Sequence, residues 1–339
     1  MKHKSYNKYA IILGLFPILI FGSCKREVSE ELAPENYLLI VNTLSETISI
    51  YDLEHDTLKE DVLETGKTPN DLLILGDLGL LVNSGFQGIA ALDVIDLKEM
   101  KLIKRVPLPL GSNPYSITAS ENKFYVTLAA KDQVLVLDKN FIQQDSFTVG
   151  RWPEGIDYYD GTIYVACSGF NTQDFSYRDG YLYIIDTRSQ PYKIDSVKVG
   201  KNPQMVKIYS GKVYVMCTGD YTSENGSFYV YDPVQKLLVD SVRINFNPQD
   251  FVYYQGKYFF TDFLRGIFAT SDGNRTDTVT VISGAHRIIM DNGSLWVSIF
   301  SRNDQNYVIQ ILPESGEILW IEAGQAKGVG PIGIYRKLN

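Results

Sequence analysis

GKNPQMVKIYSGKVYVMC, residues 200–217, joins a Gly and an Asn-Pro pair to an apolar strand pattern, a turn and a second strand. Closely similar stretches are GRWPEGIDYYDGTIYVAC at residues 150–167 and FNPQDFVYYQGKYFFTD at residues 246–262. The unit returns roughly every 45 residues, and a period of that size is typical of repeat architectures. The fold therefore depends on what one unit contains and how many units there are.

Seven copies of the unit can be aligned on their first residue, which is Pro69, Pro114, Pro153, Pro203, Pro248, Ala285 or Pro331. In five copies a turn residue follows eight positions later, namely Asn122, Gly161, Gly211, Gly256 and Gly293. Each full unit has four short stretches rich in Val, Ile, Tyr and Phe, bounded by Gly, Pro, Asn and Asp. Four such strands predict one blade of a β-propeller, so seven units predict seven blades.

The two ends of the repeat region complement each other. Residues 330–335 (GPIGIY) have the pattern of an innermost strand but no partner strands after them. Residues 37–42 (YLLIVN) and 47–52 (TISIYD) are partner strands with no innermost strand before them. Joining them completes one blade and removes the exposed edges of an open array. We expect an all-β, seven-bladed propeller over residues 37–339, one domain closed by pairing of the N- and C-terminal segments.

The first 24 residues have the three parts of an export signal. A basic leader precedes the apolar stretch 11–21, and Gly22-Ser23-Cys24 follows. Small residues directly before a cysteine resemble the lipobox of bacterial lipoproteins, which implies a lipidated Cys24; an ordinary secretory signal with an incidental cysteine is the alternative. The polar residues 25–36 then form a tether. We expect a lipid-anchored protein of the outer membrane, at the cell surface.

Charge and cysteine content restrict the function further. The chain has 40 acidic and 32 basic residues and a net charge of -8, so no basic face is expected and nucleic acid is not an expected partner. Cys167 and Cys217 occupy the same place in neighbouring repeats. Because matching strands of adjacent blades stand too far apart for a disulfide, we expect two buried thiols.

The first position after each aligned residue starts an innermost strand, where side chains ring the mouth of the central channel. These positions hold Asn70, Tyr115, Glu154, Gln204, Gln249, His286 and Ile332. One histidine without a cysteine at ligand spacing does not make a metal site, and no metal or cofactor is predicted. His286 is interpreted either as a ligand contact or as a hydrogen-bonded structural residue.

The loops at one face of the propeller are rich in aromatic and arginine side chains. Two of these loops, residues 168–179 and 218–225, are long, and long loops on a rigid scaffold commonly carry function. The face has the aromatic residues Phe86, Tyr115, Trp152, Phe170, Phe175, Tyr177, Tyr221, Phe246, Phe263 and Phe300, and the polar residues Asn113, Asn202, Asn247, Arg178, Asp220, Arg265, Arg287 and Arg302. The pattern favours a binding mouth over aromatics that only pack between blades. The predicted ligand-binding residues are Tyr115, Trp152, Glu154, Phe175, Tyr177, Asn202, Gln204, Tyr221, Asn247, Gln249, His286 and Arg287.

Several second strands share a short motif, seen in FYVTLA (124–129), IYVACSG (163–169), VYVMCTG (213–219) and LWVSIF (295–300). They resemble the YVTN repeat of bacterial surface and periplasmic β-propellers, also called YncE-like proteins, over about residues 37 to 339. This resemblance implies the fold, whereas propellers host unrelated activities. With its lipobox, seven blades and aromatic face, the chain is similar to surface lipoproteins that capture cobalamin and pass it to a TonB-dependent transporter.

Three functions are consistent with these observations. The first is capture of a bulky small molecule, for which the resemblance implies a corrinoid, with a TonB-dependent outer-membrane transporter as partner and a lipid anchor in the membrane. The second is a protein- or glycan-binding scaffold of the envelope. The third is a lactonase- or lyase-type enzyme using Glu154, Asp250 and His286. The third function is disfavoured, because a calcium site normally draws on several oxygen ligands and the ring of first positions supplies one carboxylate. We therefore predict no catalytic residue.

Overall fold

The computed structural model describes residues 33–86, 88–272, 275–302, 307–313, 315 and 317–337. Residues 32–339 form one compact unit, and it alone is described below. The predicted signal, the lipidated Cys24 and most of the tether lie outside the described residues. No helix in the described ranges is long and apolar enough to cross a membrane.

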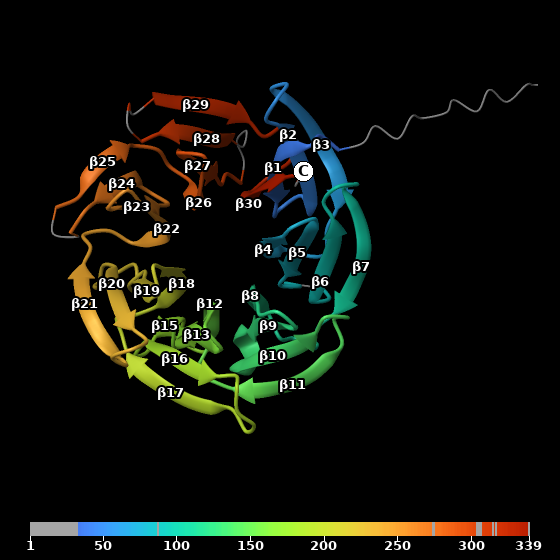
Figure 1. Ribbon diagram of the computed structural model, residues 1–339. Coiled ribbons are helices and arrows are strands. Elements are labelled where there is room, and N and C mark those ends of the chain that lie inside the picture. Colours follow the sequence, from blue (N-terminus) through green and yellow to red (C-terminus); the bar gives the residue numbers. More distant parts are fainter. Residues whose placement is uncertain are drawn as a thin grey trace, which may run out of the picture. The chain divides into compact units, whose positions relative to one another are not determined.

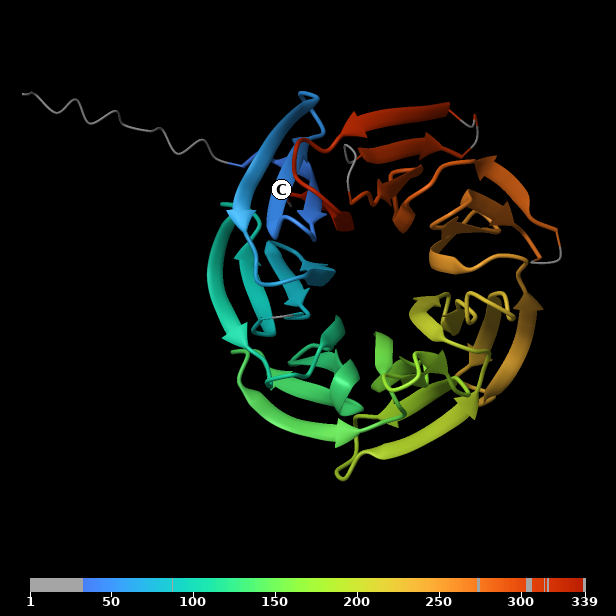
Figure 2. The same ribbon diagram turned by 180° about the vertical axis from the view of Figure 1, so that it is seen from behind.

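Seven four-stranded antiparallel sheets make up the unit and stand around a central axis as the blades of a propeller (Figures 1 and 2). Blades 1 to 3, innermost strand first, are β30 (Val329–Arg336), β1 (Asn36–Asn42), β2 (Thr47–Asp52) and β3 (Thr57–Glu64); β4 (Pro69–Leu75), β5 (Leu78–Asn83), β6 (Ala91–Asp96) and β7 (Lys101–Pro107); β8 (Pro114–Ala119), β9 (Lys123–Leu128), β10 (Gln133–Asp138) and β11 (Gln143–Thr148). The 3-10 helix η1 (Ala129–Lys131) joins β9 to β10.

Blades 4 to 7 follow the same order. They are β12 (Pro153–Tyr159), β13 (Thr162–Cys167), β16 (Tyr181–Asp186) and β17 (Lys193–Lys198); β18 (Pro203–Tyr209), β19 (Lys212–Cys217), β20 (Ser227–Asp232) and β21 (Leu237–Arg243); β22 (Pro248–Tyr254), β23 (Lys257–Asp262), β24 (Gly266–Thr270) and β25 (Asp277–Thr280); β26 (Ala285–Asp291), β27 (Ser294–Ile299), β28 (Tyr307–Leu312) and β29 (Glu317–Glu322). The loop between β13 and β16 adds a hairpin of β14 (Phe170–Asn171) and β15 (Ser176–Tyr177). The prediction of seven blades is confirmed.

The turns between the first and second strands account for the glycines that recur in the repeat. In four blades the two central turn residues have positive φ, for example 49° at Ser210 and 74° at Gly211. A two-residue hairpin turn of type I′ requires that conformation at both positions, which explains the glycine eight residues after the aligned proline. The turn before β9 is built differently, because Ser120 N donates to Lys123 O at 2.9 Å.

Pairing of β1 with β30 closes the ring. The two strands run antiparallel with Leu38 opposite Ile334 and Ile40 opposite Ile332, so the closing blade joins both ends of the repeat region as predicted. Leu38 and Ile40 are fully buried, and they pack with Trp296 and Val308 of blade 7. The closing blade is therefore held both by its backbone ladder and by the apolar core of its neighbour.

A hydroxyl at the fifth position of the second strand links each of several blades to the next. Thr127 Oγ1 donates to Glu154 O at 2.7 Å, and Thr261 Oγ1 donates to His286 O at 2.6 Å. Ser298 holds the equivalent place in β27, where its Oγ accepts the backbone N–H of its own first strand at 3.0 Å. These contacts give a physical reason for the threonine of the YVTN-like motif, since backbone carbonyls at the inner ring need donors.

Carboxylates of the innermost strands make a second set of links between blades. Each accepts a backbone N–H from the next blade at 3.1 Å: Asp71 from Ile117, Asp157 from Ile208 and Asp250 from Ile288. Because these carboxylates accept bonds from rigid strands, they fix the spacing of neighbouring blades at the channel.

Cys167 and Cys217 are buried free thiols, as predicted. Burial raises the pKa of both, that of Cys217 to about 12. Both thiols are therefore protonated at neutral pH and behave as small apolar core residues.

Candidate functional site

The loop between β13 and β16 carries an aromatic cluster at the mouth of the channel. Phe170 is its centre, with ring centroids 5.1 Å from Trp152, 5.2 Å from Tyr177 and 6.2 Å from Phe175. Phe175 is 78% exposed, whereas the other three rings are partly buried. The cluster thus holds its outermost ring in solvent on a packed aromatic base.

Three of the predicted aromatic residues have left-handed backbones, with φ of 55° at Trp152, 54° at Phe175 and 61° at Tyr221. Bulky side chains rarely adopt this conformation because the Cβ crowds the backbone. Such residues persist only where their surroundings hold them, and they are frequent at functional sites. At Trp152 the support is Asp132, whose Oδ1 accepts the Trp152 N–H at 2.8 Å.

The loop between β19 and β20 is organised around one carboxylate. Asp220 Oδ1 accepts the backbone N–H groups of Thr222, Ser223 and Glu224 at 2.8 to 2.9 Å. The backbone bond from Glu224 and the other donors hold the Asp220 pKa well below its usual range. This loop presents Tyr221, which is 50% exposed and carries a hydroxyl 3.4 Å from Nε2 of Gln249.

Two predicted ligand-binding amides are occupied by the same loop. Asn202 is fully buried, and its Nδ2 donates to Gly219 O at 3.0 Å. Asn247 Nδ2 donates to Thr218 O at 2.7 Å. Their amide donors therefore hold loop backbone. Gln204 lies at the channel itself, and its Oε1 accepts the Thr218 hydroxyl at 3.0 Å.

Arg287 extends across the channel below the mouth. It belongs to blade 7, yet its Nη2 donates to Asn70 O of blade 2 at 3.0 Å, and its Nη1 lies 3.2 Å from Met205 Sδ of blade 5. The side chain is only 9% exposed. Because one guanidinium reaches inner strands on both sides of the ring, it forms a floor beneath the mouth.

Glu154, Tyr115 and His286 lie beside this floor. Burial raises the pKa of Glu154 to about 8, although hydrogen bonding with Ser168 and Tyr115 and the charge of Arg287 oppose the shift. Burial and the Arg287 charge lower the pKa of His286 to about 3. At neutral pH the carboxyl of Glu154 is therefore largely protonated and the imidazole of His286 is neutral.

Other aromatics of the predicted face have different surroundings. Phe246 is 2% exposed and stacks on Phe268 at 4.6 Å, so it belongs to the core of blade 6, as the alternative interpretation has it. Phe300 lies 5.8 Å from the ring of His286 at the channel mouth. Phe86 is 70% exposed on a loop of blade 2.

Lys207 and Asp71 lie at the channel but were not among the predicted site residues. Lys207 Nζ donates to Asp250 Oδ1 at 2.6 Å, and Asp71 acts electrostatically on Arg287. A sequence signal existed for the carboxylates, because Asp71 and Asp250 both stand two positions after the aligned proline. Within the described ranges, no group of three or more His, Cys, Asp or Glu side chains is placed to hold a metal ion.

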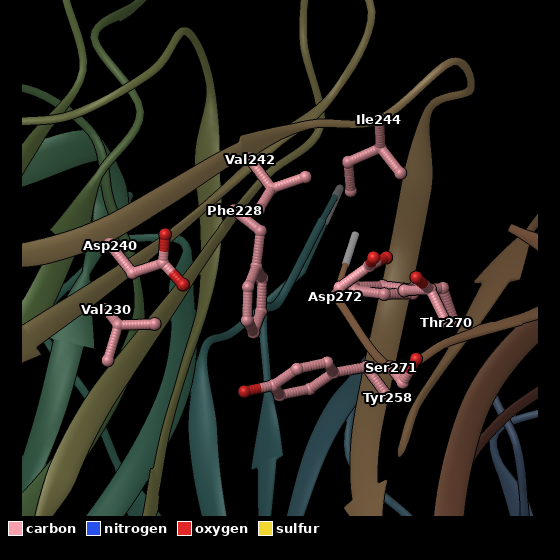
Figure 3. A pocket seen from close by; sticks show the side chains of 10 residues that line it. Phe228, Val230, Asp240, Val242, Ile244, Tyr258, Thr270, Ser271 and Asp272 are labelled. Carbon is pink, nitrogen blue, oxygen red and sulfur yellow. The ribbon is translucent and has the colours of Figure 1, made fainter. Parts of the chain in front are cut away.

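Four cavities lined by described residues contain none of the predicted site residues. Figure 3 shows one of about 70 Å³ between blades 5 and 6, lined by Phe228, Val242 and Tyr258 among others. Two wider grooves, of about 570 Å³ and 510 Å³, lie between blades 7 and 1 and between blades 4 and 5. Their lining includes turns between first and second strands, so they open on the face opposite the mouth.

Comparison with known proteins supports the fold. No protein-family model matches the chain, and no curated protein matches it. Among solved structures, a quinonprotein alcohol dehydrogenase-like protein from Bacteroides thetaiotaomicron has 14% identity and a TM-score of 0.66, with 89% of this chain and 78% of that chain covered. A catalytically inactive virginiamycin B lyase from Staphylococcus aureus with quinupristin has 14% identity and a TM-score of 0.62, covering 89% and 97%.

A third similar structure is dihydro-heme d1 dehydrogenase NirN in complex with DHE, with 12% identity, a TM-score of 0.59 and coverage of 88% of this chain and 66% of that chain. These proteins differ in activity while sharing the architecture. At such low identity the likeness extends to the fold alone, and this chain is a seven-bladed β-propeller.

Proposed function

We propose that the mouth binds a bulky small molecule with flat apolar surfaces, and that a corrinoid such as cobalamin is its ligand. The observation that carries this proposal is the pair of exposed rings, Phe175 and Tyr221, held in left-handed backbone beside a polar channel. Exposed aromatic side chains on rigid loops are frequent anchors in binding surfaces. A corrin ring offers flat faces and methyl groups to such rings, and its amides suit Gln204 and Gln249.

The strand β1 begins away from the mouth. Asn36, at the start of β1, lines the groove between blades 7 and 1 together with the turn residue Asn292. The first strand of the propeller in the sequence therefore begins on the face opposite the mouth. We propose that the segment before this strand tethers the protein to a lipidated Cys24 in the outer membrane and that the ligand passes to a TonB-dependent transporter.

Calorimetry with cyanocobalamin tests the ligand proposal. Phe175→Ala and Tyr221→Ala should each weaken binding by about 2 kcal/mol, a typical penalty for removing an aromatic anchor. Tyr159→Ala is the matched control, because Tyr159 is 40% exposed and ends β12 on the opposite face. No binding at millimolar cyanocobalamin would exclude a corrinoid, and binding unaffected by either aromatic substitution would exclude this face.

A lyase-type enzyme is the second candidate. It is favoured by one observation: Glu154 and His286 both lie near Arg287 in the channel, and at neutral pH the first can give a proton and the second can take one. Mass spectrometry of quinupristin after incubation with the protein provides a test. Conversion that is lost in Glu154→Gln would support this candidate, and an unchanged compound would count against it for this substrate.

A further inference from the structure

The groove of about 570 Å³ between blades 7 and 1 lies apart from the mouth. The two blades stand side by side where the ends of the repeat region meet (Figure 1). Trp296 and Ile321 of blade 7 and Tyr51 of blade 1 line the groove and belong to a single apolar cluster. The volume lies in the range of small-molecule sites. Because the base of the groove is part of a packed core, its shape is fixed before a ligand arrives.

Trp320 presents an exposed aromatic ring to this groove. It belongs to the outermost strand β29, and it is 54% exposed. The ring of Tyr307, on the neighbouring strand β28, packs edge to face against it with centroids 5.5 Å apart and an angle of 89°. This contact restrains the indole, while about half of the residue stays in solvent. The groove therefore offers a rigid, flat apolar surface to a ligand.

Two exposed carboxylates stand on the blade 1 side of the groove, and each is oriented by a hydrogen bond. Asn36 Nδ2 donates to Glu54 Oε1. The Tyr51 hydroxyl donates to Asp56 Oδ1 at 3.1 Å. A carboxylate can accept about four hydrogen bonds, so both groups retain positions for a ligand. This side of the groove can therefore accept hydrogen bonds from ligand hydroxyl or N–H groups.

Donors complete the lining. Arg336 of β30 pairs with Asp291 across the boundary between the blades, and Asn292 adds an exposed amide. A guanidinium only donates and an amide does both, so a ligand that only donates, such as an ammonium, would leave the guanidinium without an acceptor. The described lining holds three carboxylates and one guanidinium, which disfavours an anion. Uncharged hydroxyls, which both donate and accept, match this set best.

We propose that the groove between blades 7 and 1 binds a neutral carbohydrate, with a sugar ring stacked on Trp320 and its hydroxyls bonded to Glu54 and Asp56. A pyranose has an apolar face of C–H groups and a rim of uncharged hydroxyls, so one sugar unit can satisfy both the indole and the carboxylates. Arg336 and Asn292 supply donors to its remaining oxygens. This second site goes beyond the function proposed for the mouth and does not depend on it.

Calorimetric titration of the intact protein with maltohexaose, cellohexaose, xylohexaose and mannohexaose tests the inference. At least one of these neutral oligosaccharides should bind at millimolar concentration or below. Hexagalacturonate, which has a carboxylate on every unit, and spermine, an organic cation, should bind about tenfold more weakly than the best neutral compound. These two probes separate a carbohydrate site from a site that selects by charge.

Three variants test the assigned residues. Trp320→Ala should weaken binding of the best oligosaccharide about tenfold or more, and Trp320→Phe should weaken it less because a ring remains. Asp56→Asn tolerates the left-handed backbone at this position, where φ is 50°, and should weaken binding about threefold because it loses a charged acceptor. Tyr159→Ala is the matched control, since it removes a 40% exposed ring from the groove between blades 4 and 5 and should change nothing.

Circular dichroism verifies that each variant is folded. If Trp320→Ala fails to fold, Trp320→Phe and Asp56→Asn still decide the matter. No binding of any of the four neutral oligosaccharides at millimolar concentration would overturn the inference, and so would tighter binding of spermine or hexagalacturonate. Binding that is unaffected by the Trp320 and Asp56 substitutions would overturn it as well. Binding that is lost in Phe175→Ala instead would place the carbohydrate at the mouth and refute the groove.

Discussion

Glu154→Gln should stabilise the protein at high pH and leave its stability nearly unchanged at low pH. The Glu154 side chain is 3% exposed, and burial raises its pKa from 4.5 to about 8. A carboxyl with a raised pKa in the folded state destabilises that state wherever the unfolded chain is ionised. The penalty is absent below pH 4.5, grows as pH rises to about 8, and is complete above it.

The size of the effect follows from the pKa difference. Each pKa unit corresponds to about 1.4 kcal/mol, so the penalty on the folded wild type is about 3 kcal/mol at pH 7 and about 5 kcal/mol above pH 8. Glutamine keeps the shape and the hydrogen-bonding capacity but cannot ionise. The free energy of unfolding of the glutamine variant should therefore exceed that of the wild type by a margin that grows with pH.

Chemical unfolding of both proteins between about pH 5 and pH 9 measures this margin. Glu121→Gln is the control, because it removes one carboxylate from an exposed turn and reports the effect of net charge. A difference between Glu154→Gln and wild type that stays constant across this range would refute the assignment of a buried, largely protonated carboxyl at the channel.

Three further predictions concern the closing blade, the anchor and the inner ring. Removal of residues 330–339 takes away most of β30 and should leave unpaired strand edges, seen as aggregation; a soluble product with one cooperative unfolding transition would contradict ring closure. Cys24→Ser should move the protein from the membrane fraction to the soluble fraction without changing its melting temperature, and retention after a carbonate wash would exclude the lipid anchor. Thr261→Val loses the bond to His286 O and should lower the free energy of unfolding by about 1 to 2 kcal/mol, whereas the exposed Thr278→Val should change it little; equal effects would exclude the interblade role.

Much of the fold could be predicted from the repeat, because every blade has a similar pattern of turns and strands. A turn that needs positive φ selects glycine, as at Gly211, and a half-buried strand selects β-branched and aromatic residues. The pairing of the two ends of the repeat region could be predicted as well. Residues 330–335 lacked partner strands, and residues 37–52 lacked an innermost strand. These features can be recognised in a single sequence, because they depend on residues close together in the chain or on the number of repeat copies.

The inner site could be predicted only in part. Arg287 was expected at the face, but its contact with Asn70 joins residues 217 positions apart and depends on the width of the ring. Asn202 was expected to offer its amide to a ligand, yet the following loop folds over it and uses its donor. Phe246 was expected among the loop aromatics of the mouth face, and only the packing of blades 5 and 6 shows that it belongs to the core.

Ring closure by β1 and β30 has a kinetic consequence. The ladder pairs Leu38 with Ile334, residues at opposite ends of the repeat region, so the chain must be nearly complete before this blade can exist. Contacts of such long sequence separation slow folding, because the loop between them must close before they contribute any stability. Blades 2 to 7 can assemble in order as the polypeptide emerges, while blade 1 waits for the last segment. Synthesis of β30 therefore sets the earliest moment at which a mouth ringed by all seven blades can form.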